Sequence, residues 1–210
     1  MFEKVLFGKT KNILALLGKS GSLEDAYLAG GTACALHLGH RISYDLDFFT
    51  SRKFRVSLLA RELAKMKDFR LEKTAWGTIL GEFGKIRFSL FYYSYPLLFR
   101  SKKFEGIKIA DLRDIAAMKI AAVAERGTKR DFIDLYMICQ KISFKKTLSL
   151  YNRKYGKLTG DLVHVIKSLT YFEDAEKDVM PKMLVSISWG EVKSFFQKET
   201  KRLAKNYFLS

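Results

Sequence analysis

The chain has few of the residues that mark several common protein classes. Among 210 residues there are two prolines and two cysteines, and only 22 acidic residues stand against 38 lysines and arginines. The two cysteines fit buried free thiols in a reducing compartment better than a disulfide framework. No stretch approaches the roughly 20 unbroken apolar residues of a membrane span, and the first residues do not resemble a signal peptide. We therefore expect a soluble cytoplasmic protein with no membrane partner.

What is present is a large apolar fraction together with a strong positive charge. Apolar residues make up 48% of the chain and the formal net charge is +16. The apolar fraction excludes a disordered chain, and the length suits one compact domain or a domain with a helical extension. The charge indicates a polyanionic ligand such as a nucleotide or a nucleic acid, but charge alone does not identify it.

The pattern of elements changes near residue 110. Before it, periodicity predicts helices over 2–17, 33–38 and 56–66, and strands over 26–29, 44–49, 69–75, 78–83 and 86–93. After it, helices are predicted over 112–124 and 130–142, and the remainder is also helical in character. The chain is therefore predicted to be α+β, with a mixed-sheet domain over 1–110 and a helical domain over 111–210.

Two carboxylates stand close together on the predicted strand 44–49. Residues two apart on a strand share a face, so Asp45 and Asp47 point the same way while Leu46 points to the other face. Like charges side by side repel, and each costs desolvation. A bound divalent cation compensates this repulsion. Hard oxygen ligands at this spacing suit Mg²⁺, which can also coordinate phosphate oxygens.

A glycine pair stands shortly before these carboxylates. Gly30, Gly31 and Thr32 follow a short strand and open a helix, where free backbone N–H groups and the helix dipole favour a phosphate. Alone, the glycines fit an ordinary turn, and two acids on a strand fit a solvated edge. Their ordered combination is more specific, because metal-assisted phosphoryl or nucleotidyl transfer needs both a phosphate cradle and a metal site.

Two groups of residues, which together frame residues 28–136, resemble a known family. The first comprises Gly30-Gly31-Thr32-Ala33, Arg41, Ser43 and Asp45-Leu46-Asp47-Phe48-Phe49. The second comprises Lys119, Arg126, Arg130, Asp131 and Asp134-Leu135. In both groups the chain resembles the AbiEii-type toxins of the nucleotidyltransferase superfamily, which belong to abortive-infection toxin–antitoxin systems.

The resemblance implies a nucleotidyltransferase fold, with a small mixed sheet flanked by helices and a helical region after it. It also implies Mg²⁺-dependent transfer of a nucleoside monophosphate from an NTP to an RNA acceptor, tRNA included, or to a protein, and a neighbouring antitoxin, itself a protein in some systems. The implied metal ligands are Asp45 and Asp47, and the predicted catalytic residues are these two with Lys119 and Asp131. The implied nucleotide-binding residues are Gly30, Gly31, Thr32, Arg41, Ser43, Lys119, Arg126 and Arg130.

The second group also has readings that need no ligand. Lys119 lies in an otherwise apolar helix, so it either extends its stem to reach a phosphate in a cleft or marks the solvated stripe of an Ala-rich helix. Thr128 followed by Asp131 resembles a capping box. Asp131 and Asp134 also fit a structural clamp with Arg126 or Arg130, or a cleft lining in which Asp134 orients a base.

One expected feature of a two-metal nucleotidyltransferase is missing. A third carboxylate normally faces the other two from a later strand, but the predicted strand 86–93 contains no acid. Ser89 stands near the expected position, and Glu82 on the preceding strand is a substitute that nothing in the sequence places in the site. A catalytically degenerate nucleotide- or RNA-binding module with the same fold is therefore the alternative to an active enzyme.

Other basic and aromatic residues are open to two readings. The basic runs at 141–146 and 153–157 fit either solvated helix faces or contacts to RNA phosphates. Tyr92, Tyr93 and Tyr95 fit strand and core positions, although they could also stack on a base. The excess of positive charge over the whole chain favours a nucleic-acid acceptor.

Overall fold

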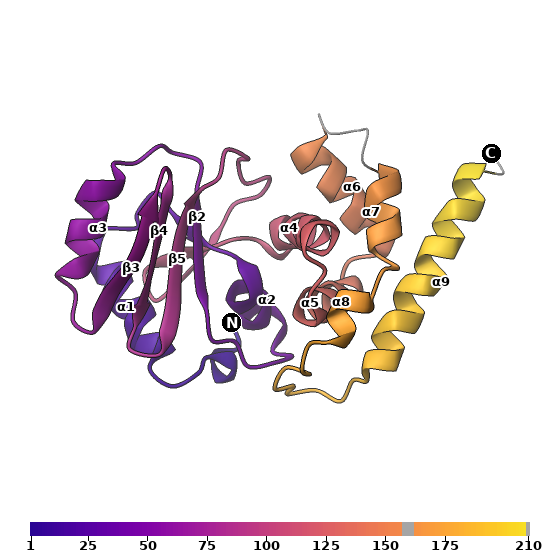
Figure 1. Ribbon diagram of the computed structural model, residues 1–210, viewed down its shortest axis with the longest axis horizontal. Coiled ribbons are helices and arrows are strands. Elements are labelled where there is room, and N and C mark those ends of the chain that lie inside the picture. Colours follow the sequence, from indigo (N-terminus) through magenta and orange to yellow (C-terminus); the bar gives the residue numbers. More distant parts are fainter. Residues whose placement is uncertain (157–161, 209–210) are drawn as a thin grey trace. The chain divides into compact units, whose positions relative to one another are not determined.

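The chain folds into two compact units. A computed structural model describes residues 1–156 and 162–208, and it divides the chain into Met1–Asp111 and Leu112–Ser210. We call the first the sheet unit and the second the helical unit, and each is described by itself (Figure 1).

The sheet unit is built on one mixed seven-stranded sheet. Its helices are η1 (Glu3–Val5), α1 (Thr10–Ser20), α2 (Gly30–Leu38) and α3 (Val56–Ala64). Its strands are β1 (Tyr27–Leu28), β2 (Leu46–Thr50), β3 (Phe69–Ala75), β4 (Thr78–Phe83), β5 (Ile86–Tyr92), β6 (Lys102–Phe104) and β7 (Ile107–Ile109). The strand order is β3-β4-β5-β2-β1-β7-β6, in which β2 is parallel to β5, β1 is parallel to β7, and the other pairs are antiparallel.

The two faces of this sheet differ in burial. On β2, Leu46 and Phe48 are fully buried, and their partners on β5 in the parallel register are Phe88 and Leu90. These four side chains belong to the core. Helix α3 packs along β3 (Figure 1). Asp47 and Phe49, which alternate with these residues along β2, lie on the opposite face, where side chains are partly exposed. The strand alternation thus separates a core face from a face that can hold a polar site.

The structure confirms the predicted α+β fold with a mixed sheet, and it corrects several element bounds. Strands 69–75 and 78–83 have the predicted bounds, while β2 begins at Leu46, so that Asp45 lies just before the strand. Helix α2 begins at Gly30 and not at residue 33, because the glycine pair itself forms its first turn. Strands β6 and β7 were not predicted, since three residues are too few to show a period of two.

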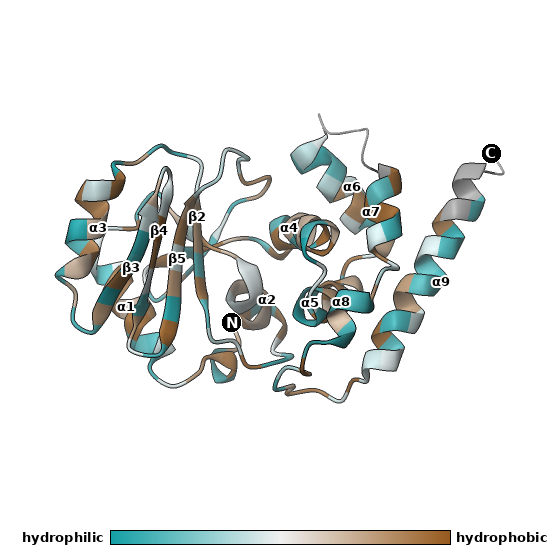
Figure 2. Ribbon diagram, in the orientation of Figure 1, coloured by the Kyte–Doolittle hydropathy of each residue, from teal (hydrophilic) through white to brown (hydrophobic). Residues whose placement is uncertain are grey.

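The helical unit packs around an aromatic core. Its helices are α4 (Leu112–Glu125), α5 (Lys129–Cys139), α6 (Phe144–Tyr155), α7 (Leu162–Ser168), α8 (Glu173–Glu176) and α9 (Trp189–Phe208). Phe132 of α5 and Phe144 of α6 both make edge-to-face contacts with Phe196 of α9. Hydrophilic and hydrophobic residues alternate along α9, as an amphipathic packing helix requires (Figure 2). None of the described helices is long and apolar enough to cross a membrane.

A buried ion pair joins two helices of this unit. Lys154 of α6 donates to Asp114 of α4 over 2.9 Å, and both side chains are fully shielded from solvent. Lys154 was predicted to belong to a basic surface run, and its burial removes it from that run. Lys157, another member of the run, lies outside the described residues.

Candidate functional site

The first group of predicted site residues begins at the turn between β1 and α2. Gly30 has a φ of +62°, a conformation that side chains with a Cβ rarely adopt. A Cβ added there would stand 2.7 Å from Oδ2 of Asp47. The Ala29 N–H donates to the Asp47 carbonyl over 2.9 Å, which fixes the turn against β2. Glycine is therefore required at position 30 both by its backbone and by its closeness to a predicted metal ligand.

The remaining members of this group gather around the first turn of α2. The Thr32 hydroxyl donates to the Asp45 carbonyl, and its oxygen lies 2.8 Å from the Ser43 hydroxyl. Arg41 is buried, and its guanidinium is so close to Gly31 that a Cβ there would overlap it. The structure thus brings Gly30, Gly31, Thr32, Arg41, Ser43, Asp45 and Asp47 to one place in the sheet unit.

The two carboxylates are held by different means. Asp45 lies before β2 and is anchored through its backbone by Thr32, whereas Asp47 lies within the strand. Both are partly exposed, while Leu46 between them is fully buried. A pair of carboxylates at this spacing, open to solvent beside a helix N-terminus, fits a hard divalent cation that shares its ligands with phosphate.

Ser89 occupies the position where a third acid was expected. It stands directly opposite Asp47 in the β2–β5 register, and its hydroxyl donates to Oδ1 of Asp47 over 2.7 Å. A serine at this position orients the carboxylate and adds no charge. Glu82, the other candidate, lies on β4 and accepts a hydrogen bond from Arg70 over 3.1 Å. Sequence reasoning could not find the Ser89 contact, because the register between residues 47 and 89 is set by the folded sheet.

The second group forms a charged cluster in the helical unit. The Lys119 ammonium lies 2.9 Å from Asp131 and 2.6 Å from Asp134, and its side chain is only 5% exposed. Arg126 donates to Asp131 from Nε over 2.8 Å, and the Thr128 hydroxyl donates to the same carboxylate over 2.6 Å. Burial of Asp131 opposes its ionisation, but the charge of Lys119 and these hydrogen bonds outweigh it and hold the pKa of Asp131 far below its usual range.

This cluster tests the readings of the second group that need no ligand. The solvated-stripe interpretation of Lys119 is wrong, because its ammonium is enclosed by two carboxylates. The capping interaction is confirmed, since Thr128 is the N-cap of α5 and accepts from the Asp131 N–H. The predicted clamp between Asp131 and Arg126 is also confirmed. Arg130 is exposed on the first turn of α5.

Comparison with known proteins identifies the family. The family model described as "Nucleotidyl transferase AbiEii toxin, Type IV TA system" matches residues 12–109 and 92–204. The chain belongs to the AbiEii nucleotidyl transferase toxin family. It is therefore a nucleotidyltransferase, an enzyme class that acts on nucleotides with the help of a divalent metal ion. The carboxylates of Asp45 and Asp47 offer hard oxygen atoms of the kind that such an ion prefers.

Each relative of this AbiEii-family chain named below covers most of its length. It is 38% identical over 192 residues to the uncharacterized protein aq_aa25 of Aquifex aeolicus (strain VF5), covering 89% of this chain and 91% of that protein. The structure resembles MenT4, a nucleotidyltransferase toxin from Mycobacterium tuberculosis, with a TM-score of 0.62, 16% identity and coverage of 91% and 80%. It also resembles JHP933 from Helicobacter pylori, with a TM-score of 0.52, 19% identity and 94% coverage of each chain. The two structural likenesses establish the fold.

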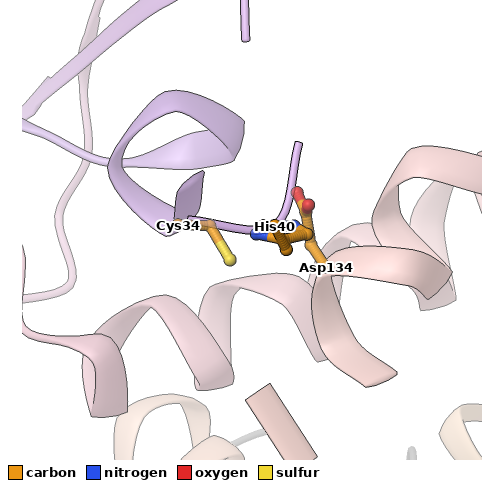
Figure 3. A group of neighbouring side chains, drawn as sticks. All are labelled: Cys34, His40 and Asp134. Atoms are coloured by element: carbon orange, nitrogen blue, oxygen red, sulfur yellow. The ribbon is translucent and has the colours of Figure 1, made fainter. Parts of the chain in front are cut away.

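Three further residues of the AbiEii chain, two histidines and a cysteine, carry nitrogen or sulfur atoms that can bind a metal. His37 on α2 lies with Nε2 2.8 Å from the Ala110 carbonyl, and burial lowers the pKa of its imidazole. Cys34 on α2 and His40 after its C-terminal Gly39 are buried (Figure 3). Asp134, also labelled there, lies on α5 of the helical unit, where it pairs with Lys119.

Replacing Gly30 with alanine is expected to impair this AbiEii enzyme more than the same change at Gly84. Both glycines have a φ near +60°, but no atom lies within 4 Å of a Cβ at Gly84. Gly84→Ala should therefore cost only the backbone strain, about 1–2 kcal/mol of unfolding free energy. Gly30→Ala should cost about 1–3 kcal/mol more, through overlap with Asp47, and should also lower nucleotide turnover. Chemical denaturation and initial rates measure both effects. Equal losses in the two variants would contradict the close approach of Gly30 to Asp47.

Proposed function

We propose that the chain transfers a nucleoside monophosphate from an NTP to an RNA acceptor in a Mg²⁺-dependent reaction, as the toxin of a toxin–antitoxin pair. The observation that carries the proposal is the close approach of the Gly30 turn to Asp47, with Asp45 tied to Thr32 of the same helix. One place in the sheet unit thus offers both backbone donors for a triphosphate and carboxylates for a cation. The family and the nucleotidyltransferase fold support this use of the site.

Each residue of the sheet-unit site has a proposed role. Asp45 and Asp47 hold Mg²⁺, and Ser89 keeps the Asp47 carboxylate in its orientation through their hydrogen bond. The N–H groups of Gly31 and Thr32 bind the triphosphate at the N-terminus of α2, and buried Arg41 braces that turn beside Gly31. When bound, the cation neutralises phosphate charge and polarises the phosphorus–oxygen bonds.

The cluster of the helical unit has proposed roles as well. Asp131 and Asp134 enclose the Lys119 ammonium and leave its side chain only 5% exposed, so Lys119 holds these two carboxylates in place and, contrary to the sequence prediction, does not itself reach a phosphate. The Arg126 side chain is 63% exposed although it is bonded to Asp131, so its guanidinium retains solvent-facing donors for a phosphate. Arg130 lies in the same first turn of α5. Asp131 then acts as a positioning residue for Arg126.

The acceptor is proposed to be RNA, including the ends of tRNA. The net charge of +16 favours association with a polyanion, and phosphate contacts of this kind need no particular sequence. The proposed antitoxin follows from family membership, since the family is described as one of toxins. The NTP and the acceptor are the two substrates to be identified.

The test is incorporation of labelled nucleotide into RNA. Wild-type protein is incubated with Mg²⁺, each α-labelled NTP in turn and total RNA, beside the Asp45→Ala/Asp47→Ala variant. We expect label in RNA with wild type only, loss of the signal on adding EDTA, and its return with excess Mg²⁺. Equal label in both samples, or no label with any NTP, would refute RNA nucleotidyl transfer. NTP binding with pyrophosphate release at background in both samples would instead support the degenerate binding module.

A further inference from the structure

An aromatic surface adjoins the Asp47–Ser89 pair on the same face of the sheet. Phe49 of β2 stands opposite Phe91 of β5, and their ring centroids are 5.7 Å apart. Tyr93 continues the surface with its ring 5.4 Å from Phe49, and the ring of Tyr95 lies 5.3 Å from Tyr93. We call these four residues the aromatic row. All four are partly exposed, whereas Phe48 on the core face of the same strand is fully buried.

The aromatic row begins one step along the strands from the site. Asp47 and Phe49 are two residues apart on β2, and so are Ser89 and Phe91 on β5. Residues at this spacing share a face, with Cα atoms roughly 6.5–7 Å apart. That separation brings a planar ring within reach of any group held at the carboxylates. Aromatic side chains on an open sheet face are a common means of stacking unpaired bases.

Basic side chains lie on this face next to Ser89, away from the aromatic row. Arg87 lies two residues before Ser89 on β5, and it is exposed. Lys73 of β3 is exposed and lies in the same cross-strand row as Ser89, through Leu80 of β4. Two nearby acids, Glu82 of β4 and Glu72 of β3, pair with Arg70. Arg87 and Lys73 thus lie on strands that are about 10 Å apart, with Arg87 offset by two residues along its strand.

We infer that this face binds the unpaired end of the nucleic-acid acceptor, an inference that rests on the proposed function. One base stacks on the aromatic row, Arg87 and Lys73 contact phosphates of the strand, and a sugar hydroxyl is directed at Asp45 and Asp47. The spread of the two cations suits the repeated phosphates of a strand. Stacking also tolerates any base, in keeping with recognition of a strand end.

The test measures RNA binding without any nucleotide substrate. Fluorescence anisotropy follows a 5′-labelled single-stranded RNA octamer and a blunt duplex of the same sequence. The variants are Phe91→Leu, which keeps an apolar side chain but removes the ring, and Arg87→Glu, which changes an exposed residue. Lys65→Glu, at the exposed end of α3, is the matched charge control. Calorimetry measures the affinity for each Mg²⁺–NTP, and thermal melting monitors folding.

We expect the octamer to bind more tightly than the duplex. Phe91→Leu should weaken octamer binding about 5- to 30-fold with unchanged NTP affinity. Arg87→Glu should reduce the slope of log affinity against log salt by about 1, whereas Lys65→Glu should leave the slope unchanged. Octamer binding that is unaffected by both Phe91→Leu and Arg87→Glu would overturn the inference. Loss of NTP affinity with unchanged octamer binding would also overturn the inference, because it would show that the aromatic row binds the base of the NTP.

The outcomes keep the two proposals apart. If wild-type protein transfers no nucleotide but binds the octamer through Phe91 and Arg87, the proposed function fails and the RNA surface stands. If it transfers nucleotide and the same variants bind RNA normally, the proposed function stands and the surface is refuted. Because Arg87 is exposed, its variant remains informative even if Phe91→Leu unfolds.

Discussion

Replacing Asp47 with asparagine is expected to lower the kcat of nucleotide transfer by about a thousandfold or more. That factor corresponds to about 4 kcal/mol of transition-state stabilisation. Asparagine keeps the shape of the side chain and a carbonyl oxygen that can still accept from Ser89. It removes the negative charge that holds a divalent cation against a triphosphate. The loss should therefore appear in turnover and in metal affinity, with a melting temperature close to that of wild type.

Two further variants test whether the loss of turnover is specific to the Asp47 carboxylate. Asp25→Asn changes an acid of the sheet unit that pairs with Arg52 at the surface, so turnover should stay within about twofold of wild type. Ser89→Ala removes one hydrogen bond to Asp47 and no charge, so we expect a loss of roughly 10- to 100-fold, smaller than that of Asp47→Asn. Initial rates over a Mg²⁺ titration distinguish these cases. A full rate in Asp47→Asn at saturating Mg²⁺ would contradict the proposed role of Asp47 as a metal ligand.

Replacing Asp114 with alanine is expected to destabilise the helical unit by about 3–5 kcal/mol. The substitution leaves the Lys154 ammonium buried without the carboxylate that it contacts over 2.9 Å. Removing one partner of a buried pair is costly because the remaining charge has lost its compensation. Urea denaturation followed by circular dichroism measures the change. With a stability typical of small domains, such a loss would leave much of the unit unfolded at 37 °C.

The matched control is an exposed pair in the same unit. Asp174 and Lys177 lie 3.2 Å apart with most of both side chains in solvent, so Asp174→Ala should cost less than about 1 kcal/mol. The double variant Asp114→Leu/Lys154→Met should recover most of the lost stability, because apolar side chains of similar volume replace both charges. If Asp114→Ala were as mild as Asp174→Ala, the pair would not be shielded from solvent as described.

The parts of the site that sequence could predict lie close together along the chain. Gly30, Thr32, Asp45 and Asp47 were found because their order and spacing describe a turn, a helix start and a strand. Their roles as phosphate and metal ligands remain predictions. The structure added that Gly30 and Asp47 are in near contact, which explains why that position must be glycine.

The parts that sequence could not predict depend on contacts between distant residues. Lys119 stands out in an apolar helix, but its partners lie 12 and 15 residues away, and only packing of α4 against α5 brings them to it. Lys154 looks like one more surface lysine until its pairing with Asp114, 40 residues earlier, is known. Strand β7 is too short to show a pattern, and its pairing with β1 joins residues about eighty positions apart.

The position of β1 in the sheet has a consequence for synthesis on the ribosome. One edge of β1 pairs with β2, which follows within about twenty residues, but the other edge pairs with β7, roughly eighty residues later. At about 5–20 residues per second, several seconds pass before that second edge can close. Until then the strand that leads into the Gly30 turn is held on one side only. The nascent chain should therefore emerge without a completed site and acquire it late, when the last strands of the sheet have left the exit tunnel.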